Sequence, residues 1–216
     1  MDPFRLCLAL GPVAVYLMLI GALNVAKRPF LVSGGRDTAA LGLALSGFVI
    51  VGPIELFFPA TAAVHFGPYV WLLLLALYGL CLGLIVLLLQ PRLVIYNVSA
   101  DQLRPILADV VDQLDAEARW AGETLLLPNL GLQLHLDTTA SMRNVALVAI
   151  NAHQSFDGWR RLEDTLAAAL ARAETGRNPR GASLLSAGTL IGLALVLAIA
   201  RAPEAVAEAL FEMLHL

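Results

Sequence analysis

Residues 68–98 read PYVWLLLLALYGLCLGLIVLLLQPRLVIYNV, and two different patterns meet within this stretch. Residues 68–89 carry no charged side chain, and they are long enough to cross a hydrocarbon core of about 30 Å, which takes about 20 helical residues. Residues 92–98 read RLVIYNV, and the β-branched, aromatic and other apolar side chains at 93–96 indicate a strand buried on both faces. We therefore expect the chain to leave a membrane span and enter a folded domain within a few residues.

The composition also indicates a membrane protein. Of the 216 residues, 59% are hydrophobic and 14% are charged, whereas about a quarter of the residues in a soluble domain are charged. Between Arg92 and Arg180 lie 20 of the 31 charged residues. Four apolar segments predict transmembrane helices: about 4–26, 38–58, 68–89 and 182–200.

The amino-terminal segment is expected to stay in the protein rather than to be cleaved as a signal peptide. Asp2 lies beside Arg5, the apolar run is too long, and no A-x-A site precedes Lys27. The segment is therefore counted as the first of the four spans.

The positions of the basic residues predict an orientation. Lys27, Arg28 and Arg36 lie in the loop after the first span, while the loop at 59–68 contains no Lys or Arg. Because basic loops favour the cytoplasmic side, we expect the amino terminus outside and residues 91–178 in the cytoplasm. The expected location is a bacterial inner membrane, with the lipid bilayer as a partner.

Residues 91–178 are expected to fold as a soluble α+β domain in the order β-α-β-β-β-α, with helices on one face of an antiparallel sheet. A capping box at Ser99 and Gln102 precedes the first helix, although Pro105 suggests that regular helix begins nearer Arg104. The later elements are expected at 123–128, 130–137, 144–151 and 156–174. The resulting division is 1–90 for three spans, 91–178 for the domain, and 179–216 for the fourth span and a tail helix.

The last hairpin of the domain suggests an interaction surface. Pairing the strands through the intervening turn sets Ala146, Val148 and Ile150 against leucines of the strand before it. That register leaves four candidate interface residues on the outer face: Gln133, His135, Val145 and Leu147. Such a face is less polar than a fully solvated one, so it is either covered by other parts of the domain or forms a contact with a subunit or with the membrane-proximal helices.

Two polar residues near the second span are candidate functional residues. Glu55, in VGPIELFFP at 51–59, lies about 25 Å along the span from Thr38 at about 1.5 Å per residue, so we place it near the outer surface. His65 lies in the loop on the same side. Glu55 either caps backbone groups freed by Pro53 and Pro59 or has a functional role, such as lining a polar vestibule or pairing with a partner cation.

Small residues spaced by four are candidate helix contacts within the chain or between subunits, because they let helix backbones approach closely in lipid. They include Gly79 and Gly83 in the third span and Gly188 and Gly192 in the fourth.

The tail 203–216 is expected to be amphipathic. Leu210 and Leu214 lie on its apolar side, and Glu204, Glu208 and Glu212 lie opposite them. Because a helix resting on an anionic bilayer usually has a basic polar face, docking on another protein is an equal alternative.

No catalytic, metal-binding or cofactor motif occurs. Cys7 and Cys81 lie in apolar stretches without ligand spacing, and neither a phosphate-binding loop nor a nucleophile motif is present. A net charge of −3 without a basic run gives no reason to expect nucleic acid as a partner.

The sequence therefore favours a non-catalytic assembly or scaffold subunit, acting as a homo-oligomer or within a larger membrane complex through protein–protein interactions. A small channel or transporter subunit, with a pore formed by a ring of copies, is the first alternative. A membrane enzyme that uses Glu55 and His65 is the second.

Overall fold

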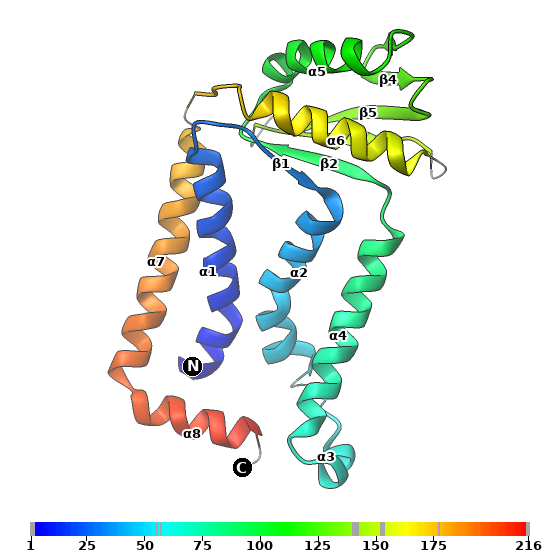
Figure 1. Cartoon of the computed structure of the whole chain (residues 1–216). Coiled ribbons are helices and arrows are strands. Elements are labelled where there is room, and N and C mark those ends of the chain that lie inside the picture. The colour runs from blue at the N-terminus through cyan, green and yellow to red at the C-terminus, as the bar shows by residue number, and fades with distance from the viewer. Residues whose placement is uncertain are drawn as a thin grey trace. The chain divides into compact units, whose positions relative to one another are not determined.

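The computed structural model describes residues 3–54, 56, 58–139, 143–151, 154–176 and 178–214. The chain divides into two compact units, shown as a ribbon in Figure 1. The first unit contains most of the long helices: residues 1–20, 38–88 and 183–216. The second unit contains a sheet with two helices: residues 21–37 and 89–182.

Four helices are long and apolar enough to cross a membrane: Pro3–Val25 (α1), Gly34–Ile54 (α2 to Val49, then the π-helix η1, Ile50–Ile54), Tyr69–Leu88 (α4) and Pro179–Arg201 (α7). The four apolar helices expected from the sequence are thus confirmed to within a few residues. Two shorter helices are Ala60–Phe66 (α3), where a loop was expected, and Pro203–Leu214 (α8), which is the expected tail helix. Pro53 lies inside η1. Because proline has no backbone N–H to donate, the helix widens here into a π turn.

Glycines allow close packing among the long helices. A Cβ at Gly47 of α2 would collide with the carbonyl oxygen of Leu8 in α1, and one at Gly188 of α7 would lie 2.8 Å from the carbonyl oxygen of Ala14. The phenol of Tyr78 in α4 donates a hydrogen bond to the carbonyl oxygen of Gly42, at 2.6 Å. Because so close an approach needs bare backbone, Gly47 and Gly188 let helices of one chain pack together.

The second unit is built on a six-stranded antiparallel sheet in the order β1-β2-β6-β5-β4-β3. The strands are Phe30–Ser33 (β1), Arg92–Tyr96 (β2), Arg119–Ala121 (β3), Thr124–Leu127 (β4), Leu132–Thr139 (β5) and Asn144–Ala149 (β6). Four of these strands were expected, and β1 and β3 were not. β1 comes from the segment between the first two spans and pairs with β2, with Phe30 opposite Tyr96.

Helices Ala100–Leu114 (α5) and Phe156–Leu170 (α6) lie on one face of this sheet (Figure 1). Their buried leucines and valines meet those of the strands in one core, which includes Leu103, Leu107, Leu134, Leu162 and Leu166. α5 begins at Ala100 and not near Arg104, because Pro105 is exposed one turn from the helix start, where water can reach the carbonyl group it leaves unpaired.

The expected register of the last hairpin is wrong by one residue. Leu147 pairs with Leu136 and Val145 pairs with Thr138, so both side chains point into the core, where they are 0% and 2% exposed. Val145 and Leu147 are therefore core residues and not outer-face residues. Apolar side chains on both faces of β6 made the two registers equally plausible from the sequence.

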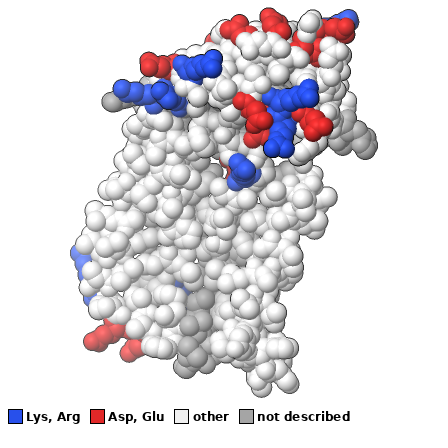
Figure 2. All heavy atoms as spheres, in the orientation of Figure 1, with Lys and Arg blue, Asp and Glu red and all other residues white. Residues whose placement is uncertain are grey.

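Charged residues gather on the unit that contains the sheet. Figure 2 shows Lys, Arg, Asp and Glu over its visible surface and few of them along the long helices. Each of the four apolar helices contains an 18-residue window with no more than two charged residues. This distribution suits a surface that faces water on one unit and a surface that faces lipid on the other.

Candidate functional site

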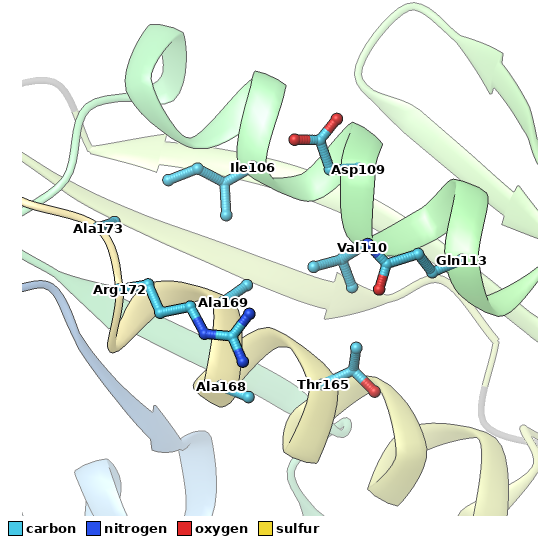
Figure 3. Close-up of a pocket in the computed structure, with 9 residues that line it drawn as sticks. All are labelled: Ile106, Asp109, Val110, Gln113, Thr165, Ala168, Ala169, Arg172 and Ala173. Carbon is cyan, nitrogen blue, oxygen red and sulfur yellow. The ribbon is translucent and has the colours of Figure 1, made fainter.

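A groove of about 420 Å³ runs between α5 and α6 on the side away from the sheet (Figure 3). Nine residues line it: Ile106, Asp109, Val110, Gln113, Thr165, Ala168, Ala169, Arg172 and Ala173. The groove exists because α6 and the turn after it present alanines where larger side chains would meet α5. Val110 is 2% exposed and forms part of the floor.

Polar side chains from both helices surround this floor. Asp109 and Gln113 come from α5, whereas Thr165 and Arg172 come from α6 and the turn that follows it (Figure 3). Asp109 and Arg172 are exposed, and within the described part of the chain no ion pair joins them. One free carboxylate and one free guanidinium across an apolar floor suit a polypeptide segment better than a small reactive substrate.

A buried polar cluster lies elsewhere in the same unit and was not foreseen. We call Asn24, Asn97, Thr175 and Asn178 the asparagine cluster, and each is 8% exposed or less. Asn97 Nδ2 donates to the carbonyl oxygen of Ala26 at 2.6 Å and to Thr175 Oγ1 at 3.0 Å. These bonds join the end of α1, the loop after β2 and the segment before α7.

The remaining hydrogen bonds of the asparagine cluster join the segment before α7 to the end of α1 and the residues that follow it. Asn178 Nδ2 donates to Asn24 Oδ1 at 3.2 Å, and the Thr175 amide donates to the carbonyl oxygen of Lys27 at 2.9 Å. Asn97 has a left-handed φ of 61°, which favours Asn or Gly over most residues. Its Oδ1 is buried and accepts no hydrogen bond from any described residue. Bonds between uncharged amides and hydroxyls give this cluster an anchoring role rather than a chemical one.

Asp115, at the end of α5, is a buried carboxylate that is 2% exposed. Its Oδ1 accepts from the Glu117 amide at 3.0 Å and from Asn129 Nδ2 at 2.7 Å, and its Oδ2 accepts from the Asn129 amide at 2.8 Å. Burial by itself raises the pKa of Asp115, but these donors, together with the Leu130 amide, outweigh it and hold the pKa below its ordinary value. The carboxylate fastens α5 to the turn between β4 and β5.

Of the two polar candidates near the second span, the structure describes His65 alone. Glu55 lies outside the described residues. His65 is exposed in α3, and its Nδ1 lies 3.1 Å from the carbonyl oxygen of Thr61, one turn earlier in the same helix.

The four interface candidates of the last hairpin lie on two different faces of the sheet, since Val145 and Leu147 point into the core. Gln133 and His135 remain on the face opposite α5 and α6, where His135 is exposed and stands across from Val148. Gln133 is bound by its neighbours: Asn151 Nδ2 donates to its Oε1 at 3.0 Å, and Gln154 Nε2 donates to its carbonyl oxygen at 2.6 Å. On the same face, the Tyr96 hydroxyl donates a hydrogen bond to the carboxylate of Asp37, which lies in the first turn of α2.

The candidate contact residues in the helices differ in whether they already pack against another helix of the chain. Gly188 contacts α1 within the chain, whereas a Cβ at Gly79, Gly83 or Gly192 would meet nothing within 4 Å. In α8, Leu210 is 40% exposed, and the side chain of Leu214 lies outside the described part.

The described residues contain no group of three or more His, Cys, Asp or Glu side chains able to hold a metal ion. Comparison with family models, curated proteins and solved structures finds no match for this chain.

Proposed function

We propose that this chain is a non-catalytic membrane protein of the bacterial inner membrane that assembles with copies of itself. In this proposal the four apolar helices span the bilayer, the amino terminus lies outside, and the α+β unit lies in the cytoplasm, as the basic residues between the first two spans favour. The spans provide the contacts between copies, and the α+β unit presents a surface to a partner.

The observation that carries this proposal is the unfilled small-residue face of α4. Gly42, Gly47 and Gly188 already pack against neighbouring helices of the chain. Gly79 and Gly83 lie four residues apart, and a Cβ at either would meet open space. Because small residues spaced by four let two backbones approach closely, this face suits a helix from a second copy.

The low burial of α4 supports the same conclusion. Within its most apolar window, 11% of the residues are buried inside the chain, so most of the helix is available to lipid or to another copy. A helix–helix contact in lipid needs close packing rather than extra hydrophobicity. The leucines around α4 would therefore face lipid, and the glycine face would hold the neighbour.

Disulfide crosslinking in native membranes tests the proposed contact. Cys7 is first replaced by serine. Two single-cysteine variants are then compared. The first keeps Cys81, and the second carries Gly79→Cys together with Cys81→Ser. Residues 79 and 81 are two positions apart, so they lie about 200° apart around the helix. We expect a crosslinked dimer from the cysteine at 79 and little from the cysteine at 81.

Native mass spectrometry of the chain extracted from its own membranes supplies the second test. Peaks at multiples of 23.0 kDa that collapse to one copy in Gly83→Leu would support the proposed assembly. Gly11→Leu is the matched control, because a Cβ at Gly11 also meets nothing within 4 Å and Gly11 lies on a different helix. A single copy in the wild-type chain, or equal crosslinking at 79 and 81, would overturn the proposal.

We assign the groove between α5 and α6 as the partner surface of the α+β unit. If a second chain is retained in the same spectra, Ala168→Arg should release it by filling the groove, since Ala168 is exposed and lines it. Ala167→Arg is the control, because Ala167 is exposed on the same helix but does not line the groove. Equal retention of the second chain by both variants would remove the groove from the proposal.

A further inference from the structure

A pocket of about 180 Å³ lies beside the turn of the hairpin formed by β4 and β5. It shares no lining residue with the groove between α5 and α6. Its walls include Leu126 and Pro128 together with three uncharged amides, Gln133, Asn151 and Gln154, and no charged residue lines it. The pocket is therefore neutral, with hydrogen-bonding groups beside an apolar wall.

Backbone hydrogen bonds hold the walls of this pocket together. Leu126 of β4 pairs with Gln133 of β5, and both side chains lie on the face of the sheet opposite α5 and α6. The Ile150 amide donates to the carbonyl oxygen of Gln133 at 3.0 Å, and the Ser155 amide donates to that of Gly131 at 3.5 Å. Because these bonds fasten the chain between β6 and α6 to the hairpin, the pocket is formed before any ligand binds.

Two of the three amides have an unused hydrogen-bonding atom. Gln154 Nε2 donates to the carbonyl oxygen of Gln133 at 2.6 Å, and Asn151 Nδ2 donates to Gln133 Oε1 at 3.0 Å, which orients both glutamine side chains. Gln154 Oε1 is buried and accepts no hydrogen bond from any described residue, and Gln133 Nε2 donates to none of them. Because a buried acceptor without a donor is destabilising, the pocket favours a ligand that donates to Gln154 Oε1.

We propose that this pocket binds a primary carboxamide group. The N–H of the ligand amide donates to Gln154 Oε1, its carbonyl oxygen accepts from Gln133 Nε2, and the carbon atoms attached to it contact Leu126. A carboxylate has no donor for Gln154 Oε1, and the uncharged lining offers no counter-ion for it. A ketone of the same shape has the acceptor but lacks the donor.

The size of the pocket limits the ligand to one small group. Pockets for drug-sized ligands have volumes of about 300–1,000 Å³, whereas this pocket has about 180 Å³. A small free amide and the side chain of asparagine or glutamine in a polypeptide present the same group, and a peptide probe separates these two sources. The inference depends neither on how the chain assembles nor on its location in a membrane.

Saturation-transfer NMR on the full chain in detergent tests the proposal with three probes of similar shape. Isobutyramide has the donor and the acceptor, methyl isopropyl ketone lacks the donor, and isobutyrate replaces the amide with a charge. We expect saturable binding of isobutyramide with a Kd of about 1 mM, and binding of the other two that is weaker by about tenfold or more. Equal binding of the amide and the ketone would overturn the proposal, and so would no binding of the amide, since water alone would then fill the pocket.

Two variants with matched controls locate the binding in this pocket. Gln154→Met removes the acceptor and should weaken isobutyramide binding about tenfold, the effect of one lost hydrogen bond, whereas Gln113→Met in the groove between α5 and α6 should not. Leu126→Trp fills the pocket and should abolish binding, whereas His135→Trp, on the same face but outside the pocket, should not. Circular dichroism checks that each variant is folded. Unchanged binding by Leu126→Trp would overturn the proposal.

A capped tripeptide identifies the source of the amide. Alanine–glutamine–alanine with acetyl and N-methylamide ends has a primary amide only in its glutamine side chain. Tighter binding of this peptide than of isobutyramide would support the proposal with a polypeptide as the ligand. Equal or weaker binding of the peptide would support it with a free small molecule as the ligand.

Discussion

Asn129 holds both carboxylate oxygens of Asp115, one through its backbone amide at 2.8 Å and one through its side-chain amide at 2.7 Å. The two residues lie in different elements, since Asp115 ends α5 and Asn129 belongs to the turn before β5. The α5 helix is thus tied to the sheet by a charged group as well as by its apolar face.

This contact predicts a loss of stability in acid. Because the pKa of Asp115 is lower in the folded chain than its ordinary value of 3.8, ionised Asp115 stabilises the folded state above that pH. The contribution should fall away as the pH drops from about 3.8 through the lower folded pKa. Thermal denaturation of the full chain in detergent at pH 7, 4 and 3 measures it.

The control for that prediction is Asp115→Asn. This variant should be less stable than the wild-type chain at pH 7, and the gap should narrow at pH 3, where the carboxylate of the unfolded wild-type chain is largely protonated. A gap that stays constant from pH 7 to pH 3 would show that ionisation of Asp115 does not stabilise the fold.

Asn97 supports two separable predictions, one for its hydrogen bonds and one for its backbone. Asn97→Gly keeps the left-handed φ of 61° available and loses the bonds to Ala26 and Thr175. Asn97→Ala loses the same bonds and should lower the free energy of unfolding by about 1–2 kcal/mol more, because alanine disfavours this φ. Chemical denaturation of both variants in detergent measures the difference, and equal stabilities would contradict the backbone part.

Leu147→Asp should unfold the α+β unit rather than disturb a surface. Leu147 is 0% exposed and packs in the core, so the new carboxylate would be buried without a partner and would destabilise the fold by several kcal/mol. Circular dichroism and limited proteolysis measure the effect. His135→Asp, on the exposed face of β5, should leave both signals unchanged. A folded Leu147→Asp variant would refute the observed register.

Gly158→Ala should destabilise the start of α6. Alanine gains about 1 kcal/mol over glycine in a helix, but the new Cβ would collide with the carbonyl oxygen of Leu130. Forced shifts of this kind cost about 1–3 kcal/mol, so the net change should be a loss of stability. Gly176→Ala meets open space and is the control in the same thermal scan. A Gly158→Ala chain as stable as wild type would contradict the close packing at this turn.

The main elements could be predicted because each depends on a local pattern. The four apolar helices follow from segment length, and α5, α6 and four strands follow from periodicity. β1 and β3 were missed because FLVS and RWA are too short to show a period, and each is a strand only through its partner in the sheet.

The asparagine cluster could not be predicted for a different reason. Its bonds join residues that are 71 and 154 positions apart, such as Asn97 with Ala26 and Asn178 with Asn24. Each asparagine alone has the sequence character of a loop or helix end, and nothing local indicates that they meet. The groove between α5 and α6 likewise depends on where the alanines of α6 and the turn after it face α5, which composition does not reveal.

The position of β1 has a consequence for how the chain is made. β1 is synthesised before α2 and α4, and its partner β2 follows them. Leu31 can therefore pair with Ile95 only after both of these apolar helices have been made. A fragment starting at residue 91 would begin its sheet with β2 uncovered, and its backbone groups at Leu93 and Ile95 would be open to pairing with another chain. No single truncation of the sequence therefore separates the complete sheet from the long apolar helices, because β1 lies between two of them.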